Sequence, residues 1–193
     1  MEGKEKMNLP NKLTVLRVLL VPIFIFFLLS DYIYNNLIYA LGVFILASIT
    51  DMLDGKIARK IGLVTDFGKF LDPLADKILV LSALVCFVEM GLIGSVPVVI
   101  ILAREFVVTS VRLVASNKGK VIAANIFGKL KTFVQIISIC GILLLKYLSN
   151  LYQFDPFFCK VTSNLLIYLS VIFSVISGLI YIKENLAFIK QKK

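Results

Sequence analysis

The feature that most constrains this fold is a series of apolar runs too short to cross a membrane. The run 37–50 has about 14 residues, which is roughly 21 Å of helix, whereas a hydrocarbon core of about 30 Å needs about 20 residues. Its helix can cross only by continuing through Asp51 and Asp54. The run 78–88 is equally short and needs a helix that begins near Gly68. Run length therefore predicts charged residues on helices at membrane depth, facing a cavity.

Composition supports a membrane protein and limits the available chemistry. Of the 193 residues, 59% are hydrophobic, above the roughly 45–50% of soluble proteins, and mean hydropathy is +0.94. The net charge of +9 is spread among apolar segments, which fits the positive-inside rule and anionic lipid better than nucleic acid. The three cysteines form no disulfide or zinc pattern. Histidine is absent, so acid–base or metal chemistry falls to carboxylates.

The sequence predicts an all-α integral membrane protein with six transmembrane helices. We expect them at about 13–30, 37–59, 68–88, 96–112, 128–148 and 161–182. Outer loops are expected at 31–36, 89–95 and 149–160, and inner segments at 1–12, 51–76 and 104–131. The polar arm 1–12 lacks the apolar core of a signal peptide, so both termini are expected on the cytoplasmic side. The whole chain, 1–193, is expected to form a single domain.

Four aspartates form the first constellation. Asp51 and Asp54 are three residues apart, and Asp72 and Asp76 are four apart, so each pair shares a helix face. They could solvate helix ends or pair with nearby cations. They could instead bind a hard cation such as magnesium, manganese or calcium. A third interpretation contains the second: two metals clamp a phosphate for in-line displacement.

Small residues and one cation lie between the two pairs. Gly55, Ala58 and Gly68 either allow close helix packing or leave space for a nucleotide. Arg59 either grips phosphate in bidentate fashion or anchors the topology. Close packing and topology anchoring would make this a structural motif, whereas space for a nucleotide and a phosphate-binding arginine would make it a binding site.

Basic residues form a second constellation. Arg104 and Arg112 are eight residues apart and share a helix face, while Lys129 and Lys131 begin a later helix, whose N-terminus favours anions. They either anchor the topology or bind a phosphate-bearing acceptor. Two further polar residues, Thr14 and Arg17, could reach the same cavity or anchor the first turn of their helix.

The stretch 51–76 resembles the signature of the CDP-alcohol phosphatidyltransferase family. That signature is Asp, two residues, Asp-Gly, two residues, Ala-Arg, eight residues, Gly, three residues, Asp, three residues, Asp. Every fixed position is filled, by Asp51, Asp54, Gly55, Ala58, Arg59, Gly68, Asp72 and Asp76. The flanking segments NLPNKLTVLRVLLVPIF, KFLDPLADK, ILAREFVVTSVR and GKLKT are similar to those of the bacterial phosphatidylglycerophosphate synthases within the family. The resemblance covers residues 8 to about 135.

The resemblance implies six transmembrane helices in the bacterial cell membrane, commonly as a homodimer, with a metal and nucleotide cavity open to the cytoplasm. It implies two divalent metal ions, Mg²⁺ or Mn²⁺, held by Asp51, Asp54, Asp72 and Asp76, with Asp76 also the general base. The residues implied to line the CDP group are Gly55, Ala58, Arg59 and Gly68. Those implied to receive the acceptor phosphate are Arg104, Arg112, Lys129 and Lys131.

The expected function is therefore transfer of a phosphatidyl group from CDP-diacylglycerol to sn-glycerol 3-phosphate, with release of CMP. One alternative keeps the chemistry and changes the acceptor to serine, inositol phosphate or phosphatidylglycerol. Four cations in the second constellation favour a phosphorylated acceptor. An alternative of another class is a divalent-cation transporter, which gains nothing from Arg59. How Thr14, Arg17 and Glu105 divide structural and binding roles stays open.

Overall fold

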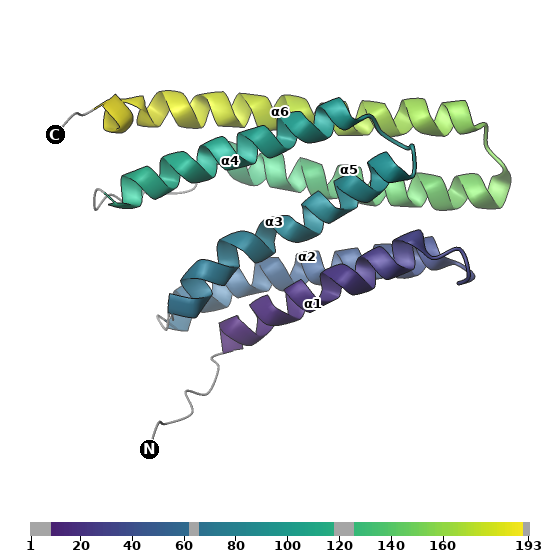
Figure 1. Cartoon of the computed structure of the whole chain (residues 1–193), viewed down its shortest axis with the longest axis horizontal. Coiled ribbons are helices and arrows are strands. Elements are labelled where there is room, and N and C mark those ends of the chain that lie inside the picture. The colour runs from purple at the N-terminus through teal and green to yellow at the C-terminus, as the bar shows by residue number, and fades with distance from the viewer. Residues whose placement is uncertain (1–8, 62–65, 118–125, 191–193) are drawn as a thin grey trace, which may run out of the picture. The chain divides into compact units, whose positions relative to one another are not determined.

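The computed structural model describes the backbone of residues 9–61, 66–117 and 126–190, and the side chains of 13–50, 75, 77–115 and 126–185. The described backbone contains six α-helices and no strand, which confirms the expected all-α class (Figure 1). The helices are α1 (Leu9–Leu29), α2 (Asn36–Ile61), α3 (Asp66–Glu89), α4 (Ser95–Asn117), α5 (Ile126–Tyr152) and α6 (Pro156–Lys190).

The helices carry their charged residues where run length predicts. Helix α2 continues past Thr50 through Asp51 and Asp54 to Ile61, and α3 begins at Asp66, before Gly68. Helix α4 likewise continues through its charged residues to Asn117. A proline also lies inside α1 without ending it. The predicted extension of all three apolar runs is therefore confirmed.

The turn between α3 and α4 follows from one glycine. Gly91 has φ +68°, a conformation that glycine adopts without strain. Its N–H donates to the Val88 carbonyl at 3.0 Å, and the Leu92 N–H donates to the Phe87 carbonyl at 2.9 Å. These two bonds form a Schellman motif, which satisfies the last carbonyls of α3. The expected turn at 89–95 is thus confirmed.

The expected outer loop at 149–160 is wrong. Helix α5 extends to Tyr152 and α6 already begins at Pro156, leaving three connecting residues. The Asp155 carboxylate accepts a hydrogen bond from the Phe157 N–H at 3.0 Å, and proline is favoured at the first helical position. Asp155 therefore acts as an N-cap, which starts the helix earlier than the apolar pattern indicates. At its other end α6 continues to Lys190, beyond the expected end at 182.

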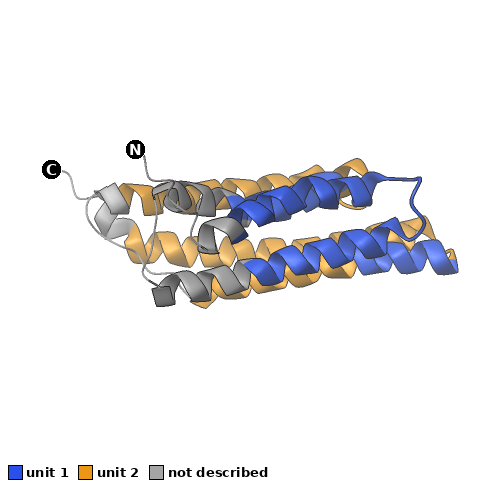
Figure 2. Cartoon of the chain, turned by 90° about the horizontal axis from the view of Figure 1, so that it is seen from below, with its two compact units in different colours: residues 1–86, 143–152 blue, residues 87–142, 153–193 orange. Residues whose placement is uncertain are grey.

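The chain divides into two compact units, coloured separately in Figure 2. Unit 1 contains 1–86 and 143–152, and its described part includes the pair α1 and α2, which lie side by side (Figure 1). The Phe24 and Phe44 rings, with centroids 5.6 Å apart, lie at the centre of this pair. Ala40 and Ala47 are fully buried on α2. Small residues at such spacing let two helices approach closely.

Unit 2 contains 87–142 and 153–193, and α4 and α6 lie side by side in it (Figure 1). The Asn164 Oδ1 accepts from the Gly94 N–H at 3.2 Å. Further along, the Arg104 Nε donates to the Ser174 carbonyl at 3.2 Å. Both bonds join residues separated by 70 positions, so α4 and α6 run parallel and in register. Helix α5 contacts α6 through Ser138, whose hydroxyl donates to the Leu166 carbonyl at 3.0 Å.

Among the described residues, two segments are long and apolar enough to cross a membrane, Ile126–Tyr152 and Pro156–Asn185. The apolar parts of α1 and α2 are shorter, at Leu13–Leu29 and Asn36–Thr50. For α2, crossing a bilayer requires that its acidic residues be part of the span. By length and composition, two of the described helices are thus consistent with a helical membrane protein.

Candidate active site

The signature residues lie in the C-terminal part of α2 and the N-terminal part of α3, which follow one another in the chain. Asp51 and Asp54 are in the second half of α2, and Asp72 and Asp76 are in the first half of α3. Their side chains lie outside the described residues, as do those of Gly55, Ala58, Arg59 and Gly68. The helical backbone nevertheless gives each aspartate pair the spacing that puts both members on one helix face. Ala75, between the second pair, is fully buried.

The donor set fits divalent metals of the hard class. Four carboxylates on helical backbone, all in unit 1, supply the oxygen ligands that Mg²⁺ and Mn²⁺ prefer. Helix positions fix the order of the carboxylates along each face. The chemistry of these residues is therefore compatible with a carboxylate-bound metal centre.

In unit 2 the structure brings together two of the four predicted basic residues. Arg104 donates from all three of its guanidinium nitrogens: Nε to the Ser174 carbonyl at 3.2 Å, Nη2 to the Ser177 hydroxyl at 2.9 Å, and Nη1 to Glu105 Oε1 at 2.7 Å. Its side chain is 12% exposed. The stem of Arg104 lies directly over Gly178, where an added Cβ would be 2.9 Å from its Cγ. Glycine at 178 is therefore what admits this arginine against α6.

Glu105 links Arg104 to the beginning of α5. The same oxygen, Oε1, accepts from Lys131 Nζ at 2.6 Å. The side chains of Glu105 and Lys131 are 14% and 7% exposed. Two cations thus share one carboxylate oxygen in a poorly solvated place, where such contacts are stronger than at a surface.

The other two predicted basic residues are arranged differently. Arg112 and Lys129 are exposed, and within the described part of the chain neither makes a hydrogen bond or an ion pair. Arg112 lies eight residues beyond Arg104 on α4, and Lys129 lies two residues before Lys131 on α5. The structure therefore gives one buried bridged pair, Arg104 with Lys131, and two accessible cations on the same two helices.

Thr14 and Arg17 are not exposed anchors of the first turn. Both are buried in α1, at 2% and 3% exposure, and their spacing puts them on one helix face. Further along the same face lie the buried apolar side chains of Val21, Phe24 and Leu28. Burial of both side chains is compatible with the cavity interpretation, which stays a prediction.

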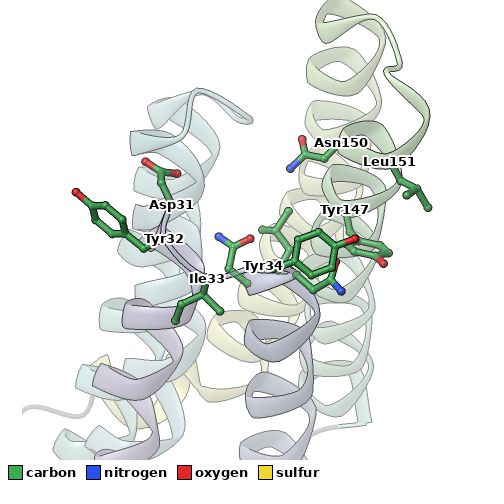
Figure 3. Close-up of a pocket in the computed structure, with 10 residues that line it drawn as sticks. Asp31, Tyr32, Ile33, Tyr34, Tyr147, Asn150 and Leu151 are labelled. Carbon is green, nitrogen blue, oxygen red and sulfur yellow. The ribbon is translucent and has the colours of Figure 1, made fainter.

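A pocket formed by described residues lies elsewhere. It has a volume of about 550 Å³ and is formed by the connection between α1 and α2 together with the end of α5 (Figure 3). Asp31, Tyr32, Tyr34, Tyr147 and Asn150 are among the residues that line it. The start of α2 lies about 15 residues, or roughly 22 Å of helix, from Asp51. This pocket is therefore separate from the signature, and its tyrosines are typical of a membrane interface.

Three contributors to the basic site were missed by reasoning on charge alone. Ser174, Ser177 and Gly178 on α6 form the seat of Arg104. Their signal is present in the sequence as small residues at helical spacing within an apolar run, which is typical of a helix-packing face. The partner helix could not be identified from that signal.

Comparison with known proteins agrees with the signature. A family model described as CDP-alcohol phosphatidyltransferase matches residues 7–176, which include the aspartates, α4 and the start of α5. The chain belongs to the CDP-alcohol phosphatidyltransferase family. Enzymes of this family depend on divalent metal ions.

Relatives within the family align over nearly the whole chain. A CDP-diacylglycerol–glycerol-3-phosphate 3-phosphatidyltransferase of Bacillus subtilis is 42% identical over 189 residues, covering 92% of this chain and 95% of the relative. The protein of that name in Rickettsia felis is 35% identical over 178 residues, covering 91% and 94%. A probable phosphatidylglycerophosphate synthase of Mycobacterium tuberculosis H37Rv is 37% identical over 184 residues, covering 93% and 82%.

Proposed function

We propose that this chain transfers the phosphatidyl group of CDP-diacylglycerol to sn-glycerol 3-phosphate, giving phosphatidylglycerophosphate and CMP for anionic phospholipid synthesis. The observation that carries the proposal is its similarity, 42% and 35% over more than nine-tenths of its length, to proteins named for this reaction. The buried Arg104–Glu105–Lys131 cluster supports an acceptor that bears a phosphate.

The chemistry requires one bond to form and one to break at the same phosphorus. An acceptor hydroxyl oxygen bonds to the phosphatidyl phosphorus, and the bond from that phosphorus to the CMP oxygen breaks. The hydroxyl is a poor nucleophile until a base takes its proton. We assign that proton to the Asp76 carboxylate, because the chain contains no histidine. CMP leaves with the electron pair of the broken bond.

Asp51, Asp54, Asp72 and Asp76 are proposed to hold two divalent ions, Mg²⁺ or Mn²⁺. When bound, the ions would neutralise the donor pyrophosphate and the charge that develops on CMP. The proposed lining of the CDP group is Gly55, Ala58, Arg59 and Gly68. Small side chains would let the nucleotide approach the helix backbone, and Arg59 would bind phosphate.

The acceptor phosphate is assigned to Arg104, Arg112, Lys129 and Lys131. Arg112 and Lys129 are exposed, so they can meet an anion that arrives from water. Lys131 is buried beside Glu105, where its charge acts through little solvent. Thr14 and Arg17, both buried on α1, are proposed as further cavity residues.

We further propose one membrane domain over 1–193, with six spans, both termini in the cytoplasm and a homodimeric state. Helices α3 and α5 each contribute to both compact units, which supports a single domain. Tyr32 and Tyr34 are exposed in the connection between α1 and α2, and Tyr152 is exposed at the end of α5. The signature begins at the other end of α2. Tyrosines are typical of a membrane interface, so we assign these three to the outer one. The aspartates then face the cytoplasmic side, where glycerol 3-phosphate is dissolved.

The decisive experiment measures CMP release by purified protein in detergent with CDP-diacylglycerol and magnesium. The acceptors compared are glycerol 3-phosphate, serine, inositol phosphate and phosphatidylglycerol. We expect release with glycerol 3-phosphate and formation of phosphatidylglycerophosphate. Release only with another acceptor would retain the reaction and refute the assigned acceptor. No release by folded, metal-binding protein would favour a divalent-cation transporter instead.

A further inference from the structure

Arg104, Glu105 and Lys131 are not three equivalent contributors to a basic site. Arg104 is fixed against α6 by the Ser174 carbonyl and the Ser177 hydroxyl, and its stem lies on Gly178. With all three guanidinium nitrogens engaged, it cannot turn toward a ligand without losing one of these bonds. Its position is therefore determined by α6.

Glu105 is oriented by Arg104 and in turn orients Lys131. Because Oε1 accepts from Arg104 at 2.7 Å, the carboxylate is held in one orientation. Because the same atom accepts from Lys131 at 2.6 Å, the ammonium group of Lys131 is held as well. The order of dependence runs from α6 through Arg104 and Glu105 to the first turn and a half of α5.

Lys131 is the member that most needs such help. A lysine ammonium sits on a flexible four-carbon stem, and fixing it costs side-chain entropy. With a side chain 7% exposed and its Nζ 2.6 Å from Glu105 Oε1, the Lys131 side chain is oriented before any ligand arrives. A group organised in advance binds its partner with less loss of free energy.

We propose that Glu105 is a positioning residue for the acceptor: it holds the Lys131 ammonium where the acceptor's phosphate binds. This inference rests on the proposed function, because it needs a phosphate-bearing acceptor. It differs from a packing role for Glu105, in which shape would matter more than charge. It also differs from direct binding of the acceptor by Glu105, which is unfavourable because a carboxylate repels a phosphate.

The test is a double-mutant cycle on acceptor affinity. In Glu105→Gln the shape is kept and the charge is lost, so we expect the KM for glycerol 3-phosphate to rise about tenfold. The kcat and the KM for CDP-diacylglycerol should stay within about twofold. In the Lys131→Met background, Glu105→Gln should add less than about twofold, because its target is gone. Glu89→Gln, an exposed glutamate at the end of α3, is the matched control and should change neither constant.

A second variant separates charge from shape and guards against a folding defect. Glu105→Asp keeps the carboxylate on a shorter stem, so its KM should fall between wild type and Glu105→Gln. Full additivity in the cycle would overturn the proposal, as would a Gln variant closer to wild type than the Asp variant. Wild-type protein that uses only an acceptor lacking a phosphate would refute the proposed function and this inference together. Wild type active on glycerol 3-phosphate with an additive cycle would refute this inference alone.

Discussion

The seat of Arg104 on α6 makes a sharp prediction for Gly178→Ala. A Cβ at position 178 would lie 2.9 Å from Arg104 Cγ and 3.3 Å from its Nε. Carbon atoms in contact are about 3.5–4.0 Å apart, so the arginine stem must move by at least about 0.6 Å. The bond from Nε to the Ser174 carbonyl is already 3.2 Å, and such a shift takes it beyond hydrogen-bond range.

The magnitude follows from these two effects. Overpacking a tight site costs about 1–3 kcal/mol, and a lost hydrogen bond from a charged donor costs about 1.5–3 kcal/mol. Replacing glycine by alanine in a helix also lowers the conformational entropy of the unfolded chain, which offsets about 0.4–1 kcal/mol of this destabilisation. We expect Gly178→Ala to lower the free energy of unfolding by about 2–4 kcal/mol. Gly42→Ala, on α2, is the matched control because an added Cβ there meets nothing within 4 Å.

The assay is unfolding of purified protein in mixed micelles, followed by helical circular dichroism as the denaturing detergent is increased. A decrease for Gly178→Ala with no decrease for Gly42→Ala is the expected result. In an Arg104→Ala background the clash is removed, so Gly178→Ala should then cost less than about 0.5 kcal/mol. Equal stability of Gly178→Ala and Gly42→Ala, each in protein that keeps Arg104, would refute the reasoning.

The remaining predictions concern the proposed reaction. Asp76→Asn should lower kcat by at least about 100-fold, the usual contribution of a general base. CDP-diacylglycerol should still bind to this variant in a filtration assay. Substantial turnover by the variant would show that Asp76 is not the base. Arg112→Ala should raise the KM for glycerol 3-phosphate by about tenfold and leave the KM for the lipid donor unchanged, with the exposed Lys160→Ala as control; equal changes in both constants would point to a structural role. Chelation of divalent ions should abolish CMP release and added magnesium should restore it, whereas activity in excess chelator would contradict a carboxylate metal site.

Run length and periodicity predicted most of the fold. The continuation of α2 through Asp51 and Asp54 followed from the thickness of a bilayer alone, and the structure confirms it. The start of α6 did not follow, because it depends on one capping bond between Asp155 and Phe157 rather than on hydrophobicity. The sequence placed the end of the last helix at about 182, whereas α6 continues to Lys190, because a helix can carry cations at its C-terminal end.

The site was predictable only where its residues are close in sequence. The signature is local, so its spacing could be read directly. The bridge from Glu105 to Lys131 joins residues 26 positions apart, and Arg104 reaches α6 across 70 to 73 positions. Spacing along one helix carries no information about which other helix supplies the partner. The charge pattern therefore indicated basic residues, while the structure separates the buried bridged pair from exposed Arg112 and Lys129.

The common offset of 70 residues between α4 and α6 limits how this chain can change. Gly94 with Asn164, and Arg104 with Ser174, form two fixed points along parallel helices. Inserting one residue between the points of either helix would rotate the second point by about 100° and shift it by about 1.5 Å. A matched insertion in the other helix would restore the alignment. Length changes within these two segments are therefore expected to occur as compensating pairs, even though the segments lie far apart in the sequence.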